Sequence, residues 1–322
     1  MKTNRIHLLL ITAFLASAQL AAAQTYPDKP VRIIVPFATG TAGDTISRLL
    51  ADSMSGSLKQ PFIVENRPGA GGNVGSQAAA RSPADGYTIL MAATPNFAIN
   101  QTLYSKAAVG FDADADFRPL GLAMSAPNLI VANNAVPFKD FAGMLAYARK
   151  NPGHLSFGSY AAGSTGHLAG AMINAQAGID LLHIAAKDPL TMVAGEHIQL
   201  ALVTPTATLP LVRAGRLKAL AVTSTRRLSS AQDIPTVSES GLTGFEATAW
   251  YGYVVPKRTP DAIARVLETE LERAINSPRA KEFARTSGNE ITWMNAATFG
   301  AYVKQERAKW GDAVRRSGAQ PD

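Results

Sequence analysis

The chain alternates between short apolar runs and segments with helical spacing. Several helical patterns follow directly on strand-type runs, which are VRIIVPF (31–37), FIVEN (62–66), YTILMAA (87–93), NLIVAN (128–133) and LSFGS (155–159). Short apolar strands separated by helices are typical of a mostly parallel sheet that is covered on both faces. The pattern therefore predicts an α/β fold.

The second half of the chain continues this alternation. Its segments are GHLAGAMINAQAG (166–178), LLHIAA (181–186), IQLALVT (198–204), TLPLVRAG (208–215), LKALAVTS (217–224) and ATAWYGYVVP (247–256), with helical patterns from Asp261 and from Thr298. No repeat or low-complexity linker separates two contiguous halves. We therefore expect a first domain (24–124), a second domain (125–247) and a return to the first (248–322).

Two further expectations follow from this three-part order. The strands that cross between the domains should lie near Gly121–Ser125 and Thr248–Val254, because these segments flank the second domain. The last helix places Phe299, Tyr302, Val303 and Trp310 near helical spacing, so its apolar side should pack on the first domain.

The first 23 residues have the pattern of a secretory signal peptide. Lys2 and Arg5 precede the apolar run LLLITAFLASA, and Ala21–Ala23 form a small-residue cleavage site before Gln24. A membrane anchor is the weaker alternative, since a span needs roughly 20 apolar residues. We expect an exported, periplasmic protein.

The composition of the 322-residue chain argues against several kinds of bond, partner and site. The chain has no Cys, which excludes disulfides, and its 31 Lys and Arg against 24 Asp and Glu give a net charge of +7 that is not gathered in any block. Without a basic stripe interleaved with aromatic residues, a nucleic-acid partner is not expected. The histidines show no metal-ligand spacing, so neither a metal nor a cofactor is expected.

Two small-residue loops are the candidate binding elements. PFATGTAGD (36–44) and SYAAGSTGHL (159–168) each lead from a strand to a helix, and Asp44 is placed to cap the first of these helices. Free N–H groups and the positive end of the helix dipole attract anions at such positions. Together the loops predict a carboxylate site, although an ordinary strand-to-helix turn explains either loop alone equally well.

Two other motifs in the chain fall short of their patterns. GAGGNVG (69–75) has Val74 where the dinucleotide-binding pattern requires Gly. Ser164 and His167 are a possible nucleophile and base of a secreted hydrolase, but Ala162 takes the first Gly position of the nucleophile elbow. A helix cap and a structural imidazole are the simpler interpretation of this pair.

Motifs along nearly the whole mature chain resemble a known family, the periplasmic solute receptors of tripartite tricarboxylate transporters, called Bug receptors. They are YPDKPVRIIVPFATG…D (26–44), FIVENRPGAGGNVG (62–75), DGYTILMA (85–92), AIN (98–100), GSTGHLAG (163–170), HI (183–184), AGRLKALAVTS (214–224), DIPTVSESG (233–241) and AWYGYVVP (249–256). The resemblance implies a type II "Venus flytrap" with two lobes, each a mixed sheet covered by helices. It also implies a carboxylate held between the lobes by the two loops, and a closed form that docks on membrane permease subunits.

The chain departs from the family pattern at three places near this expected site. Thr41 stands where relatives carry Gly, the segment from Ala186 is about three residues shorter and lacks the usual Tyr, and Val203 replaces a common Asp. These changes favour an aliphatic or aromatic carboxylate over an amino acid or citrate. Lys187 is the one cation near this wall, and a solvated loop residue is its alternative interpretation.

Both lines of argument lead to one set of expectations. We predict a non-catalytic, monomeric receptor; a carboxylate sensor that acts on a sensor kinase is the alternative, with the hydrolase third. The expected ligand-binding residues are Phe37, Gly40, Thr41, Ala42, Asp44, Thr94, Asn96, Ala162, Gly163, Ser164, Thr165, His167, Lys187 and Thr204.

Overall fold

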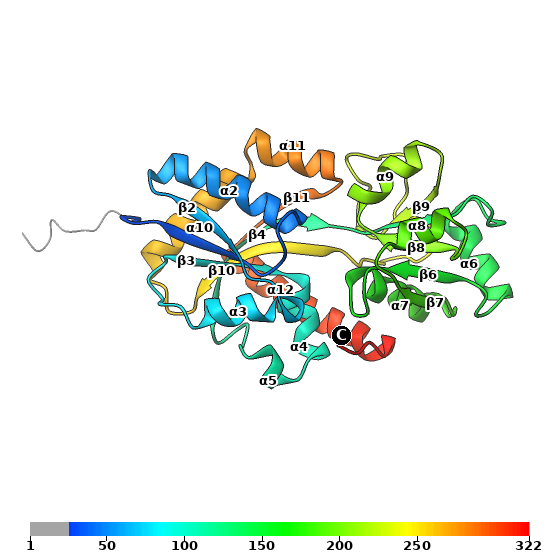
Figure 1. Ribbon diagram of the computed structural model, residues 1–322, viewed down its shortest axis with the longest axis horizontal. Coiled ribbons are helices and arrows are strands. Elements are labelled where there is room, and N and C mark those ends of the chain that lie inside the picture. The colour runs from blue at the N-terminus through cyan, green and yellow to red at the C-terminus, as the bar shows by residue number, and fades with distance from the viewer. Residues whose placement is uncertain (1–25, 322) are drawn as a thin grey trace, which may run out of the picture.

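The computed structural model describes residues 26–321, so the predicted signal peptide lies outside the described residues. In Figure 1 the chain forms an elongated molecule with two lobes side by side, each built on one sheet with helices around it. Of the described helices, none combines the length and the apolar character that a membrane span requires.

The first lobe is built on a six-stranded sheet. Its strands, in spatial order, are β11 (Glu290–Asn295), β4 (Phe117–Ala126), β10 (Ala249–Pro256), β3 (Thr88–Ala93), β1 (Val31–Val35) and β2 (Phe62–Asn66). β1 runs parallel to β2 and β3, whereas β10 is antiparallel to β3 and β4. β11 is antiparallel to β4.

Helices cover both faces of this sheet. Val31, Ile33 and Val35 pack with α2 (Ala42–Leu58), α10 (Asp261–Ile275) and α11 (Pro278–Ser287). Ile34 points to the opposite face, because side chains alternate along a strand, and joins a cluster to which four other helices of this lobe contribute. These are α3 (Asn73–Ala80), η2 (Pro95–Ile99), α4 (Asn100–Leu103) and α12 (Ala296–Ser317).

The second lobe is built on a five-stranded sheet. Its strands, in spatial order, are β7 (Leu182–Ala185), β6 (Ser156–Ser159), β8 (Leu200–Val203), β5 (Leu129–Ala132) and β9 (Lys218–Val222). β6 is parallel to β7 and β8, so the carboxyl ends of these three strands lie at one edge of the sheet. α6 (Phe141–Lys150) and α7 (Thr165–Ala177) pack on one face, and α8 (Pro189–Ala194) and α9 (Pro205–Arg213) pack on the other.

The chain passes between the sheets twice, at neighbouring positions. It leaves β4 and enters β5 through Asn128, and it returns into β10, where Ala249 pairs with Ala126. Thr223 ties the two passages together, since its N–H donates to the Asn128 carbonyl (3.0 Å) and its own carbonyl accepts from the Ala247 N–H (3.0 Å). An outgoing strand beside a returning strand is necessarily antiparallel. Both sheets are therefore mixed, as the family resemblance implies, rather than mostly parallel as the apolar pattern favours.

The C-terminal region contains a strand that the sequence pattern did not predict. Between the two expected helical patterns lie α11 and β11, and α12 begins at Ala296, with Asn295 as its N-cap. Phe299 and Trp310 of α12 are fully buried. α12 packs on β4 and η2 of the first lobe and also reaches α7 of the second, so it spans the junction.

Candidate ligand-binding site

The first candidate loop joins β1 to α2. Thr41 is the N-cap of α2, and its hydroxyl accepts from the Asp44 N–H (3.3 Å) and donates to the Ala38 carbonyl (3.0 Å). The expectation that Asp44 caps this helix is therefore wrong, because the helix begins two residues before Asp44. In Figure 1 this end of α2 points toward the second lobe.

Asp44 organises the first loop from inside. Its buried carboxylate accepts from the Gly40 N–H (2.9 Å) and from the Asn66 amide (2.9 Å), and it pairs with Arg48 (2.9 Å). Burial opposes ionisation of this group, but the hydrogen bonds from Arg48, Gly40 and Asn66 outweigh it and lower the pKa of Asp44. Its acceptor capacity is largely used within the loop, so it positions Gly40, which has a φ of +84°.

Two predicted site residues lie behind this loop in the core of the first lobe. Thr94 accepts from the Trp250 N–H (2.8 Å), and Asn96 accepts from the Ala93 N–H (2.9 Å) and donates to the Ser76 hydroxyl (2.8 Å). Both are fully buried, so their polar groups support the fold behind the loop. The half-buried ring of Phe37 comes close to Gly72, as Asn96 also does.

The second candidate loop joins β6 to α7. Ser164 is the N-cap of α7, and its hydroxyl accepts from the His167 N–H (3.3 Å) and lies 3.0 Å from the Ser159 hydroxyl. The Gly163 N–H donates to Nδ1 of His167 (3.0 Å), which closes the loop over the first turn of the helix. Ala162 lies partly exposed within this loop.

The arrangement of Ser164 and His167 is that of a helix cap. The Ser164 hydroxyl bonds the backbone N–H of His167, and the imidazole Nδ1 is occupied by Gly163. A nucleophile requires its base within hydrogen-bond reach through the ring nitrogen. This geometry contradicts the hydrolase interpretation of the pair.

The remaining predicted residues lie around the second loop. Lys187 follows β7 and is exposed. The N–H of the preceding residue, Ala186, donates to the Ser159 carbonyl (2.9 Å), which places Lys187 beside the second loop. Thr204 directly follows β8 and is the N-cap residue of α9. Both lie at the sheet edge where β6 ends, which brings them near Ala162–His167.

The two lobes touch on both sides of the junction. The Leu103 side chain of the first lobe lies so close to Gly163 that a Cβ at Gly163 would come within 2.7 Å of it. On the other side, Pro205 at the start of α9 lies against Gly288 at the end of α11. Ser229 of the second lobe also donates its N–H to the Glu290 carboxylate (2.7 Å).

Three residues near the loops were not among the predicted site residues. Ser159 links the Ser164 hydroxyl to Nε2 of His183 (2.8 Å), and the buried Asn128 donates to Thr165 (3.4 Å). The Tyr251 ring lies against Gly43 in the first turn of α2, and burial raises its pKa to about 12. Ser159 had a weak signal as the last residue of a strand that enters a candidate loop, whereas the other two positions depend on long-range packing.

A stacked histidine pair behind the second loop predicts a loss of stability in acid. The His167 and His183 rings lie 3.7 Å apart at 14°, and burial, with a further contribution from His167, lowers the pKa of His183 from 6.5 to about 4. Between these values the unfolded chain binds a proton that the folded chain excludes, so stability should fall as the pH drops through this window. Urea unfolding between about pH 7 and pH 4.5 should show a shallower decline in H183Q.

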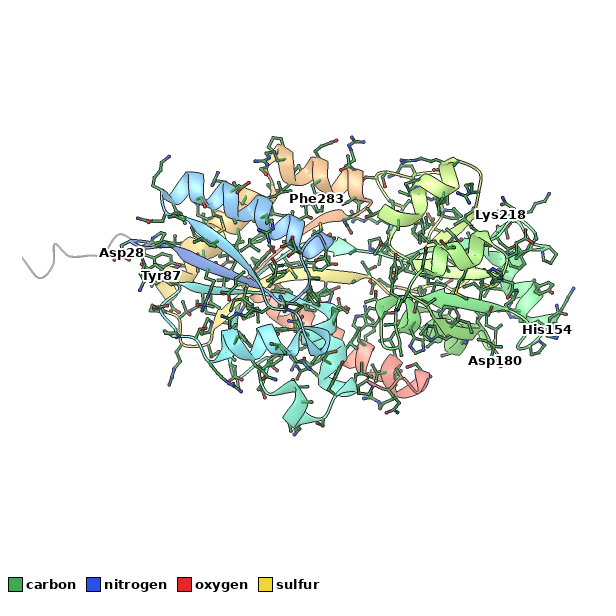
Figure 2. The ribbon with its side chains drawn as sticks, viewed as in Figure 1. Asp28, Tyr87, His154, Asp180, Lys218 and Phe283 are labelled. Atoms are coloured by element: carbon green, nitrogen blue, oxygen red, sulfur yellow. The ribbon has the colours of Figure 1, made fainter. Side chains whose placement is uncertain are left out.

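His154→Gln is the matched control for this measurement. His154 is exposed at the far end of the second lobe (Figure 2), so its replacement should leave the pH dependence of the wild type unchanged. Equal slopes in H183Q and in the wild type would contradict the role of the stacked pair.

Two mixed sheets joined by neighbouring passages, with small-residue loops leading into helices at the junction, define a two-lobed periplasmic binding protein. The chain belongs to the tripartite tricarboxylate transporter family of receptors, whose model matches residues 46–319. Receptors of this family are periplasmic and non-enzymatic, which confirms the non-catalytic prediction.

Named relatives agree with this assignment. BugT of Bordetella pertussis is 30% identical over 321 residues, which cover 97% of this chain and 98% of BugT. A Rhodopseudomonas palustris protein solved with adipate superimposes with a TM-score of 0.78 at 30% identity, over 92% of this chain and 100% of that one. MatC of the same species, solved with bound malate, superimposes with a TM-score of 0.72 at 25% identity. The match covers 90% of this chain and 100% of MatC.

Proposed function

We propose that this protein is an extracytoplasmic receptor that binds a small organic carboxylate between its lobes and delivers it to a tripartite tricarboxylate-type permease. The observation that carries the proposal is the pair of helix N-termini in the two loops. The N–H groups of Ala42 and Gly43 in α2, and of Thr165 and Gly166 in α7, have no acceptor among the described residues. Such groups and the helix dipole favour an anion.

The loops suit a carboxylate without a guanidinium partner. Neither loop contains Arg, and the Ser164 hydroxyl can donate beside the free N–H groups of its helix, whereas the Thr41 hydroxyl already donates to the Ala38 carbonyl. Asp44 is the only acid in the two loops, and it is engaged by Gly40, Asn66 and Arg48. An ammonium group would therefore lack a free carboxylate, which favours an aliphatic or aromatic carboxylate over an amino acid.

Closure of the lobes couples binding to delivery in this proposal. A ligand that contacts both loops binds best when the lobes are together, so it shifts the population toward the closed form. We place the division between the lobes at 124/125 and 247/248, beside the two neighbouring passages. The relatives solved with adipate and malate support a carboxylate as the ligand class.

Replacing Ser164 with Ala tests the site. We expect S164A to lose about 1 kcal/mol of stability with its helix cap and, in addition, to bind carboxylate about tenfold more weakly. The measurement is calorimetric titration of refolded, ligand-free protein with benzoate, adipate, malate, citrate and amino acids.

Ser277→Ala separates the two effects. Ser277 caps α11 in the same way, accepting from the Ala280 N–H at 3.3 Å, so S277A should lose similar stability and keep full affinity. Unchanged affinity in S164A would remove this residue from the site. Tight binding of a neutral sugar or a zwitterionic amino acid would overturn the proposed ligand class.

A further inference from the structure

A cavity of about 460 Å³ opens on the first lobe, and none of its lining residues belongs to the two candidate loops. It lies between β4, β10, η2 and α12, and its floor is apolar. The floor consists of the buried side chains of Phe97, Phe117, Val254, Phe299 and Val303. A volume of this size suits a small molecule, since ligand pockets commonly measure about 300–1,000 Å³.

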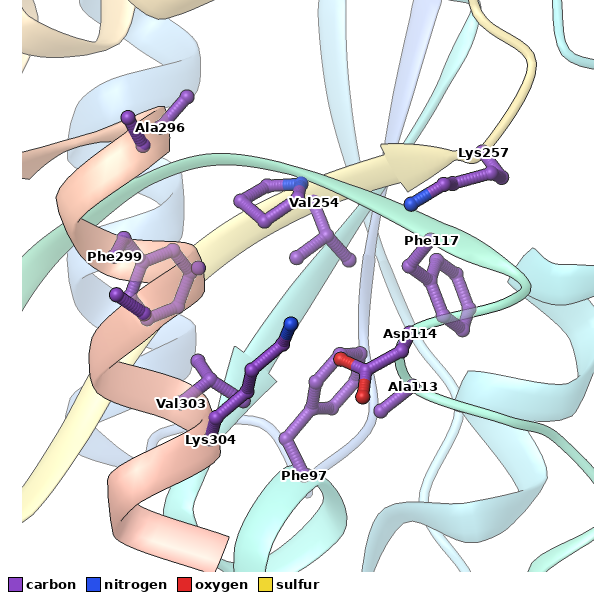
Figure 3. A pocket seen from close by; sticks show the side chains of 14 residues that line it. Phe97, Ala113, Asp114, Phe117, Val254, Lys257, Ala296, Phe299, Val303 and Lys304 are labelled. Atoms are coloured by element: carbon purple, nitrogen blue, oxygen red, sulfur yellow. The ribbon is translucent and has the colours of Figure 1, made fainter.

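Two lysines line this cavity with their ammonium groups directed inward. Lys257 follows β10 and Lys304 lies on α12, and Figure 3 shows both side chains reaching over the apolar floor. Neither forms an ion pair with a carboxylate anywhere in residues 26–321. The cavity therefore combines an apolar floor with two positive charges that have no acidic partner in the described chain.

The acidic residues beside the cavity are already engaged. Asp114, whose carboxylate also faces the cavity, pairs with Arg307 at 2.8 Å. Asp112 accepts from the N–H groups of Asp114 (2.8 Å) and Ala115 (2.9 Å), and Asp116 accepts from the Asp112 N–H (2.7 Å). The carboxylates of Asp112 and Asp116 thus bind backbone N–H groups of their own loop. Among the residues that line the cavity, Lys257 and Lys304 outnumber the one acid, Asp114.

We propose that this cavity is a second binding site, separate from the interlobe site, for a monocarboxylate with an aliphatic or aromatic body. The body replaces water on the phenylalanine and valine floor, while Lys257 and Lys304 bind the carboxylate at the mouth. A second carboxylate on the ligand would be forced against the apolar floor or against Asp114, and either contact is unfavourable. The site therefore selects an amphipathic monoanion over a dicarboxylate.

Photolabelling locates this site directly. Full-length mature protein is irradiated with octanoate that carries a diazirine at the end of its chain, and the labelled peptides are identified by mass spectrometry. We expect label in 111–119, 254–257 and 296–304, displaced by octanoate but not by octanamide, which has the same body without the charge. Labelling in K304Q should need at least fivefold more probe.

Three further variants complete the test. Ala301 is exposed and lines the cavity, so A301F should fill it, remove the label and leave the fold intact. Lys281→Gln, an exposed lysine on α11 outside the cavity, should label like the wild type. S164A should also label like the wild type, which separates this site from the interlobe site. Label confined to other peptides, equal displacement by octanamide, or unchanged labelling in both K304Q and A301F would overturn the proposal.

Discussion

Glu306→Ala is expected to lower the free energy of unfolding by roughly 3–5 kcal/mol, the range for removal of one partner from a buried ion pair. Glu306 on α12 is almost fully buried, and its carboxylate accepts from the indole N–H groups of Trp250 (3.1 Å) and Trp310 (2.7 Å). Lys309 lies 2.5 Å from its other oxygen and also pairs with Glu246. The alanine variant would leave the two buried indole N–H donors at the junction of the lobes without an acceptor.

The pKa of Glu306 reflects the burial of its carboxyl group and the charges around it. Burial raises the pKa of this carboxyl, Lys309 opposes the shift, and the nearby Glu246 adds to it. Glu306→Gln keeps an acceptor oxygen for the indoles, so it should lose less stability than Glu306→Ala.

A surface glutamate supplies the comparison for Glu306. Glu272 on α10 is exposed, and E272A should change stability by less than about 0.5 kcal/mol in the same urea unfolding at pH 7. If E306A and E272A unfold at the same urea concentration, Glu306 does not hold α12 to β10.

The alternation of strands and helices could be predicted because each element has its own hydrophobic period. β1, with three residues packed on one face and Ile34 on the other, and the helix that follows it were both anticipated. β11 was missed because its six residues lie at a sheet edge and are mostly half-buried, which leaves no clear apolar run.

The candidate loops could be located from sequence, but the roles of single residues could not. Thr41 and Asp44 are both good N-caps, and the choice between them depends on where the helix begins and on Asn66, which binds Asp44 from another strand. Thr94 and Asn96 follow a strand as ligand-binding residues often do, yet their partners are Trp250 and Ser76, distant in sequence. Such long-range contacts decide which polar side chains form hydrogen bonds within the protein and which stay free for a ligand.

Gly166→Ala is expected to destabilise the protein by roughly 1–3 kcal/mol through overpacking and to weaken carboxylate binding by at least about tenfold. Gly166 lies in the first turn of α7, and a Cβ there would come within 2.1 Å of the Leu202 carbonyl oxygen. Because that atom belongs to the backbone of β8, the helix must shift away from the sheet. Its N-terminus carries Ser164 and Thr165, so the shift should displace the groups proposed to hold the ligand.

Gly56→Ala is the control that makes this result specific. Gly56 lies on the exposed side of α2, and a Cβ there would meet nothing within 4 Å. Alanine is a better helix former than glycine, so G56A should gain about 0.5–1 kcal/mol and bind ligand normally. Thermal unfolding with and without adipate measures stability and binding in one experiment. A stable G166A protein with unchanged adipate binding would show that the close packing of α7 on β8 does not position the site.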